Sequence, residues 1–175
     1  MGSLFEIIVG NPTLPENFIS SMYDKFLFFD IDLRYTLDLF DEIQSLSEET
    51  AAIHIFYAET FEVLSSTWLG EKWSEKISSV VYELEKEKRP FGLVVLESNE
   101  GWVIVQDTPV NWGVFAFNSL DKKAFEIFNN IDKGWFLSIE DFQSAINDSS
   151  SRLREYFDVK FMEDLVLNFS VNPKR

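Results

Sequence analysis

The residues that could carry catalysis or bind a metal are few and widely spaced in this sequence. The only histidine, His54, lies in the apolar segment 51–59, and the chain has no cysteine. A metal ligand or general base at His54 would need carboxylates from elsewhere, because no second histidine or thiolate is present to join it. A lone histidine in an apolar run is more simply a half-buried strand residue with a local hydrogen bond. We therefore predict a structural role for His54, and no catalytic, cofactor or metal site.

Segment 124–142 superficially resembles an EF-hand, because acidic and amide side chains lie between two predicted helices. In the register that suits the acids, Trp135 occupies loop position six, which requires glycine for its sharp turn. Asp141 occupies the last position, which requires a bidentate glutamate. A simpler interpretation has Gly134 ending one helix, and Ser138 forming a capping box with Asp141 to begin the next. We therefore predict that this segment binds no calcium.

Sequence motifs of the common enzyme classes are missing. The chain contains no P-loop, no G-x-G-x-x-G, no G-x-S-x-G and no H-E-x-x-H. Pairs of carboxylates are uninformative, because 30 acidic residues always supply some pair for glycosidase or metal-nuclease chemistry. Basic residues form no patch for nucleic acid, and "KEKR" at 86–89 is typical of a helix end. These observations predict that the protein is not an enzyme.

The net charge of −15 is the strongest global signal, and it is unevenly distributed. Residues 1–65 have a net charge of −10, whereas residues 66–175 have a net charge of −5. A field of this sign repels nucleic acid and anionic membranes and attracts basic proteins. An acidic surface also serves solubility alone, so a structural or adaptor domain stays open as an alternative.

Length and composition fit a single domain spanning residues 1–175. A length of 175 residues is ordinary for one domain, and 18 phenylalanines predict an aromatic core. The first residues show neither a basic segment nor a long apolar one, so we expect no signal peptide. No window approaches about 18 consecutive apolar residues, so we expect no membrane span. The absence of cysteine fits a reducing compartment, and the expected location is the cytoplasm.

The segment 30–43, "DIDLRYTLDLFDEI", carries five acids and one arginine in an alternating pattern. Alternation predicts a strand over about 29–37, and helical spacing begins at Asp38, which can cap the helix. The inward side chains of this strand would be Ile31, Leu33, Tyr35 and Leu37. The acids placed outward are Asp30, Asp32, Asp38, Asp41 and Glu42. We predict that these five acids contact a protein partner, with Trp102 and Trp112 as aromatic interface anchors at strand ends.

The remaining pattern predicts an α+β fold with a mostly antiparallel sheet packed against several helices. Further predicted strands are 4–10, 51–59, 91–97, 102–107 and 112–118. Predicted helices are 13–26, which a Thr13–Glu16 capping box opens, 71–89, 121–131, 138–148 and 150–157. The chain is therefore helical from about residue 120, and 160–171 fits either helix or strand. Gly101 is expected to supply a positive φ in the hairpin between 91–97 and 102–107.

A small, acidic, cysteine-free chain without catalytic motifs resembles the immunity proteins of bacterial toxin–immunity systems. The resemblance is one of general character and includes no motif, so it implies no site residues. It implies that the protein binds and neutralises a cognate basic toxin domain, for instance a nuclease, in a one-to-one complex steered by opposite charge. Three alternatives stay open: a structural or adaptor domain, a DNA-mimic inhibitor, and an enzyme that uses carboxylates.

Overall fold

The computed structural model describes residues 4–10, 12–68, 70–89, 92–106 and 112–170. Its centre is a six-stranded sheet with the order β1-β6-β5-β4-β2-β3, in which every neighbouring pair is antiparallel. The strands are β1 (Lys25–Phe29), β2 (Ile53–Tyr57), β3 (Val63–Ser66), β4 (Leu93–Glu97), β5 (Trp102–Gln106) and β6 (Gly113–Phe117). The α-helices are α1 (Leu4–Ile7), α2 (Leu37–Leu46), α3 (Trp73–Lys86), α4 (Lys122–Asn130), α5 (Ile139–Asn147) and α6 (Val159–Phe169). The predicted α+β class is confirmed.

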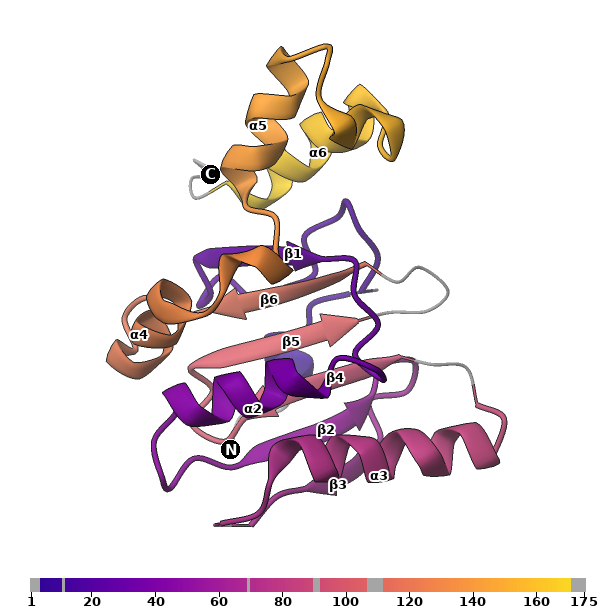
Figure 1. Ribbon diagram of the computed structural model, residues 1–175, viewed down its shortest axis with the longest axis vertical. Helices are drawn as coiled ribbons and strands as arrows, with labels where there is room; N and C mark the ends of the chain where they lie inside the picture. The colour runs from indigo at the N-terminus through magenta and orange to yellow at the C-terminus, as the bar shows by residue number, and fades with distance from the viewer. Residues whose placement is uncertain (1–3, 11, 69, 90–91, 107–111, 171–175) are drawn as a thin grey trace.

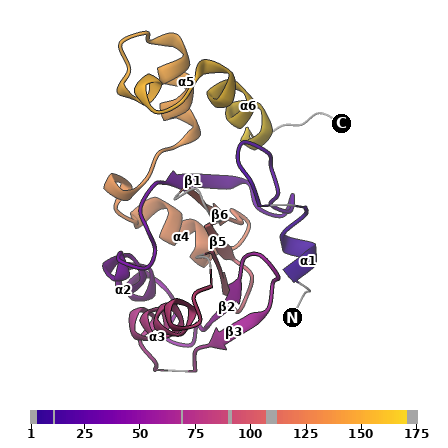
Figure 2. The same cartoon turned by 90° about the vertical axis from the view of Figure 1, so that its right-hand side faces the viewer.

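Helices cover both faces of the sheet, which gives the protein two cores. Figure 2 shows α2 and α3 on one side of the sheet and α1 on the other, and Figure 1 shows α5 and α6 beyond β1. Side chains alternate along each strand, so Leu27 and Phe29 point into the core under α2, α3 and α4. Phe26 and Phe28 point into the second core, which α1, α5 and α6 complete.

Periodicity located the regular central elements correctly. The helix predicted over 71–89 is α3, and the residues expected on its apolar face, Trp73, Ile77, Val80, Val81 and Leu84, are all buried. The predicted hairpin is β4–β5, but the positive φ of 62° belongs to Glu100 rather than Gly101. A Cβ at Gly101 would lie 3.1 Å from Cγ of Asp121, a tight contact that a small shift of that side chain would have to relieve.

The two predictions for the amino-terminal segment are wrong. Residues 4–7 form the short helix α1 instead of part of a strand, and only an isolated bridge joins Ile8 to Ile19. Leu4, Ile7 and Ile8 of this apolar run pack against one face of the sheet. The central strands of the sheet already have a neighbour on both sides, so the run does not join them as a strand. No helix forms over 13–26, because Asn17 bonds the amide of Ile19 in a turn and β1 begins at Lys25.

The carboxy-terminal third is helical as predicted. Helices α4 and α5 are confirmed, and Ser138 and Asp141 form the expected capping box. Of segment 160–171, which the sequence left open, residues 160–169 are helical in α6 and residue 171 lies outside the described residues. Segment 150–157 contains the 3₁₀ helix η2 (Arg152–Glu155). A second 3₁₀ helix, η1 (Lys133–Trp135), precedes α5. Gly134 lies within η1 and does not end α4, which stops at Asn130.

Candidate protein-binding surface at one end of the sheet

Residues 30–36, here called the acidic loop, connect β1 to α2. The strand predicted over 29–37 is wrong, because β1 ends at Phe29 and α2 begins at Leu37, one residue before the predicted Asp38. Thr36 precedes the helix without a side-chain capping bond. Phe29 pairs with Gly113, the first residue of β6, so among the described residues β6 offers no further partner for a longer β1. Residues 30–36 therefore form a turn despite their alternating pattern.

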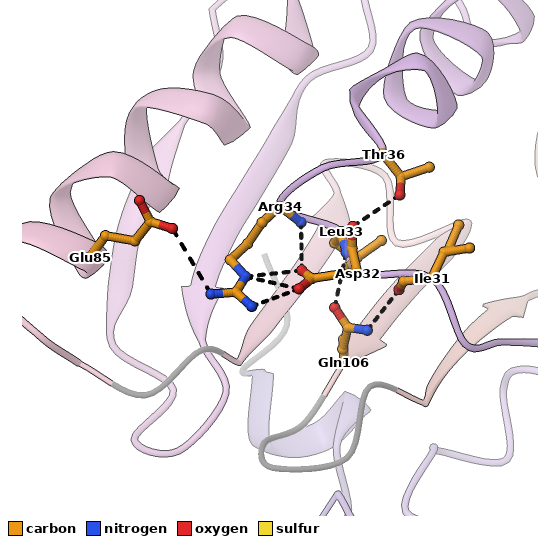
Figure 3. Close-up of polar contacts among 7 residues, drawn as sticks. All are labelled: Ile31, Asp32, Leu33, Arg34, Thr36, Glu85 and Gln106. Atoms are coloured by element: carbon orange, nitrogen blue, oxygen red, sulfur yellow. Dashed lines mark hydrogen bonds and ion pairs between the residues drawn. The ribbon is translucent and has the colours of Figure 1, made fainter.

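Buried Gln106 fastens the acidic loop to the end of β5. Its amide oxygen accepts from the Leu33 N–H at 3.2 Å, and its amide nitrogen donates to the Ile31 carbonyl at 2.9 Å (Figure 3). Leu33 is fully buried in the first core, whereas Tyr35, expected to point inward, is 74% exposed. One buried amide therefore satisfies the backbone on both sides of Asp32 and fixes the shape of the loop.

Asp32 is a structural residue of the loop. Its carboxylate accepts from the Arg34 guanidinium at 2.6 Å and from the Arg34 amide at 3.0 Å, and its carbonyl accepts from the Thr36 hydroxyl at 2.9 Å. Figure 3 shows Arg34 extended between Asp32 and Glu85 of α3, 3.9 Å from the latter. Partial burial opposes ionisation of Asp32, but the hydrogen bonds from Arg34 outweigh it and lower its pKa. Asp32 is therefore not a free acid for a partner.

The other four predicted acids divide into two pairs. Asp30 and Asp38 are exposed, at the start of the loop and in the first turn of α2. Asp41, also exposed, accepts from the Ser74 hydroxyl at 2.5 Å, which ties α2 to α3. Glu42 accepts from the Asp132 amide at 2.7 Å. Asp30 and Asp38 are thus the acids best placed to meet a partner.

Trp102 is not an interface anchor, so that prediction is wrong. It is 1% exposed in the first core, with ring centroids 5.8 Å from Trp73 and 5.4 Å from Phe115. Alternation along β5 places it on the same face as Ile104, which is also fully buried. Trp102 therefore stabilises the fold.

Trp112, by contrast, lies half-buried beside an apolar cavity of about 250 Å³, here called the aromatic pocket. Its ring meets that of Phe157 edge-on at 4.6 Å. The described residues that line the pocket are Pro12, Thr13, Leu14, Phe18, Val105, Trp112, Gly113, Val114, Tyr156, Phe157 and Phe161. Tyr156 is 75% exposed, so the pocket has an aromatic residue that a partner can reach.

The acidic loop and the aromatic pocket lie at the same end of the sheet. Phe29 pairs with Gly113, so Asp30 and Trp112 both leave the sheet at that end. The Phe29 ring covers Gly113 so closely that a Cβ there would lie 2.2 Å from Phe29 Cζ. Figure 1 shows β1 and β5 pointing towards this end, where the loop descends to α2. The fold therefore places Asp30 and Trp112 at the same end of the sheet, whereas Trp102, which pairs with the last residue of β6, lies at the other end.

His54 has the local role expected of it. Its Nδ1 lies 2.8 Å from the Ser66 hydroxyl on the neighbouring strand β3, and burial lowers its pKa. Among the residues that the structure describes, no group of three or more histidine or acidic side chains is arranged to hold a metal ion. In the EF-hand-like segment, Asp132 instead caps η1 through the Gly134 amide.

No family model matches this sequence, and no curated protein or solved structure is detectably similar to it. Function must therefore be inferred from the geometry and chemistry of the site itself.

Within the described ranges, no helix combines the length and apolar composition needed to cross a bilayer.

Two parts of this surface were missed by sequence reasoning. Gln106 occupies an inward position of a strand otherwise made of apolar residues, and a polar residue in such a place is a readable signal for a buried hydrogen-bond partner. Tyr156, Phe157 and Phe161 contact the pocket far along the chain from Trp112. Only the tertiary fold brings those aromatics together.

Replacing Arg34 by methionine is expected to reduce the free energy of unfolding by about 1 kcal/mol at neutral pH. Because Asp32 has a lowered pKa in the folded state, its pairing stabilises the fold above the unfolded pKa of about 3.9. That contribution is lost as the pH falls through the folded pKa. Urea denaturation of both proteins should therefore show a difference that shrinks below about pH 4. Lys86→Met, which removes an exposed ion pair with Glu83, is the control; a pH-independent difference for R34M would contradict this role.

Proposed function

We propose that this protein is an inhibitor that binds and neutralises a cognate basic toxin domain, of which a nuclease is one class, in a one-to-one complex. The observation that supports this most is the acidic loop, which begins at the exposed Asp30 and leads into the first turn of α2, where Asp38 is also exposed. It lies within the part of the chain with a net charge of −10. A negative surface of this kind accelerates encounter with a basic partner.

The loop is also held in one shape, which favours recognition over mere solubility. Gln106 bonds its backbone on both sides of Asp32, and Asp32 itself is paired with Arg34. A surface that is already ordered loses less conformational entropy when it binds. A solubility surface has no need of a buried amide that fixes the backbone between its acids.

Acids elsewhere are interspersed with bases, which argues against a DNA mimic. A mimic needs regular rows of uncompensated carboxylates to imitate phosphates. Along α3 and its neighbours the acids instead form ion pairs, namely Lys76–Glu71, Lys86–Glu83 and Arg89–Glu62. The acidic loop is therefore a local feature, suited to a protein surface of limited size.

Co-expression with the product of a neighbouring gene that encodes a basic toxin domain tests the proposal. We expect a one-to-one complex that persists at about 0.5 M salt, because buried contacts outlast screened surface charges. We also expect the toxin domain to lose its toxicity to the cell. A complex that forms only at low salt, or full toxicity in the presence of excess protein, would contradict an inhibitory function.

A further inference from the structure

We propose that the aromatic pocket receives one large apolar side chain, a phenylalanine, leucine or methionine flanked by lysine or arginine, from the basic partner. This inference rests on the proposed function and assigns a second set of contacts to it. Charge would bring the partner to the acidic loop, and the apolar side chain would hold it. The two contributions differ in chemistry, so they can be measured separately.

The size and composition of the pocket suit a single side chain. Its volume of about 250 Å³ lies just below the range of about 300–1,000 Å³ typical of pockets for drug-sized ligands. Apart from Thr13, the Tyr156 hydroxyl and the Trp112 indole N–H, the described residues that line it contribute apolar side chains and glycine. Such a pocket discriminates by apolar area and shape, as the central pockets of protein interfaces do.

The wall of the pocket is held in place by contacts that do not depend on a partner. Phe157 packs against Phe142 at 5.6 Å and Phe161 at 5.0 Å, in addition to Trp112. Arg154 donates to the carbonyl of Ala145 at 2.8 Å, which fastens η2 to α5. A preformed aromatic wall contributes binding energy without first having to order itself.

Charge selects a basic partner over a second copy of this chain. The exposed residues Glu16, Glu155 and Asp158 are near neighbours in sequence of residues that line the pocket. Among the bases of the same segment, Arg154 bonds backbone carbonyls and Lys160 pairs with Asp164, whereas Arg152 is exposed, so the charge that selects the partner is that of the whole chain. Two copies with a net charge of −15 each would repel one another at this surface, whereas a lysine- or arginine-flanked side chain would be attracted.

The test uses three synthetic peptides as probes, acetyl-Gly-Lys-Lys-Phe-Lys-Lys-Gly-amide and two analogues. One analogue has alanine in place of phenylalanine, and the other has glutamate in place of every lysine. Binding is followed by NMR on the full chain, with the indole N–H of Trp112 as the reporter. We expect saturable shifts of that signal with the phenylalanine peptide alone.

The matched variants are Tyr156→Ala, at the pocket, and Tyr82→Ala, on α3. Both tyrosines are largely exposed, at 75% and 64%, so neither substitution should disturb the fold. Y156A should weaken binding of the phenylalanine peptide at least about fivefold, as for an interface residue worth 1 kcal/mol, and Y82A should not change it. Equal affinity of Y156A and wild type, or shifts confined to residues outside the pocket, would overturn the inference.

The same variants separate this inference from the proposed function. In the complex with the toxin domain, Y156A should raise the dissociation rate about fivefold at any salt concentration. If the toxin domain is neutralised but Y156A changes neither the peptide affinity nor the dissociation rate, the pocket inference is wrong and the proposed function stands. If the phenylalanine peptide binds at Trp112 but no toxin domain is neutralised, the proposed function is wrong and the pocket binds basic apolar segments for another purpose.

Discussion

Replacing Trp102 by alanine is expected to reduce the free energy of unfolding by about 3–5 kcal/mol, the range for deleting a large core aromatic. The side chain is 1% exposed and lies between Trp73 and Phe115, so its removal leaves a cavity that neither ring can fill without moving. For a chain of this length, each kcal/mol lowers the melting temperature by about 2–4 °C. Thermal unfolding followed by circular dichroism should therefore show a midpoint lower by about 6–20 °C.

The same substitution also tests where Trp102 acts. At a temperature where W102A is folded, its affinity for the partner should equal that of the wild type, because the residue lies inside the first core. Tyr156→Ala is the contrasting variant, with little effect on stability and a measurable effect on binding. A W102A protein of unchanged stability that binds weakly would show that Trp102 is a surface anchor after all.

Replacing Gln106 by methionine is expected to reduce the free energy of unfolding by about 2–4 kcal/mol. Methionine keeps the length of the side chain but can neither accept from the Leu33 N–H nor donate to the Ile31 carbonyl. The buried Leu33 N–H that loses its partner costs about 1–3 kcal/mol, and the part-buried Ile31 carbonyl adds about 1 kcal/mol. Urea denaturation measures the loss, and amide hydrogen exchange at Leu33 should quicken because the loop opens more readily.

The control for this prediction is Gln143→Met on α5. Gln143 is exposed, so its substitution should change stability by no more than about 0.5 kcal/mol. Protection of the Leu33 amide should also stay at the wild-type level in Q143M. An unchanged Leu33 exchange rate in Q106M would mean that the loop holds its shape without Gln106.

Hydrophobic spacing was sufficient for the elements that bury one regular face. Helix α3 buries each of the residues on its predicted stripe, and β4, β5 and β6 follow runs of apolar residues that the interior of a sheet requires. Local preference and tertiary environment agree in these elements. Sequence alone therefore predicted the fold class and most of the sheet.

The acidic loop shows why the site was harder to predict. Its alternation is that of a strand, but a strand needs a partner, and β6 begins opposite the last residue of β1. The Asp32 carboxylate accepts a hydrogen bond from the Arg34 amide, and the Thr36 hydroxyl donates one to the Asp32 carbonyl. Short polar side chains can form such local bonds to the backbone in any turn. Which acids remain for a partner depends on these contacts, so composition could not separate Asp30 and Asp38 from Asp32.

The central claim is that charge at this end of the sheet steers a basic partner, and association kinetics test it most directly. The measurement compares Asp30→Asn/Asp38→Asn with the control Glu48→Gln/Glu49→Gln, which removes the same charge from exposed residues just beyond the other end of α2. That helix has 10 residues and is about 15 Å long, which exceeds the Debye length of about 10 Å at 0.1 M salt.

Stopped-flow association with the toxin domain at about 0.1 M salt should be roughly tenfold slower for D30N/D38N than for the wild type, and nearly unchanged for the control pair. At about 1 M salt, where the Debye length is about 3 Å, the difference between the two variants should disappear. Equal rates for D30N/D38N and the wild type at both salt concentrations, or an equal loss in both variants, would contradict the assignment of this surface as the binding site.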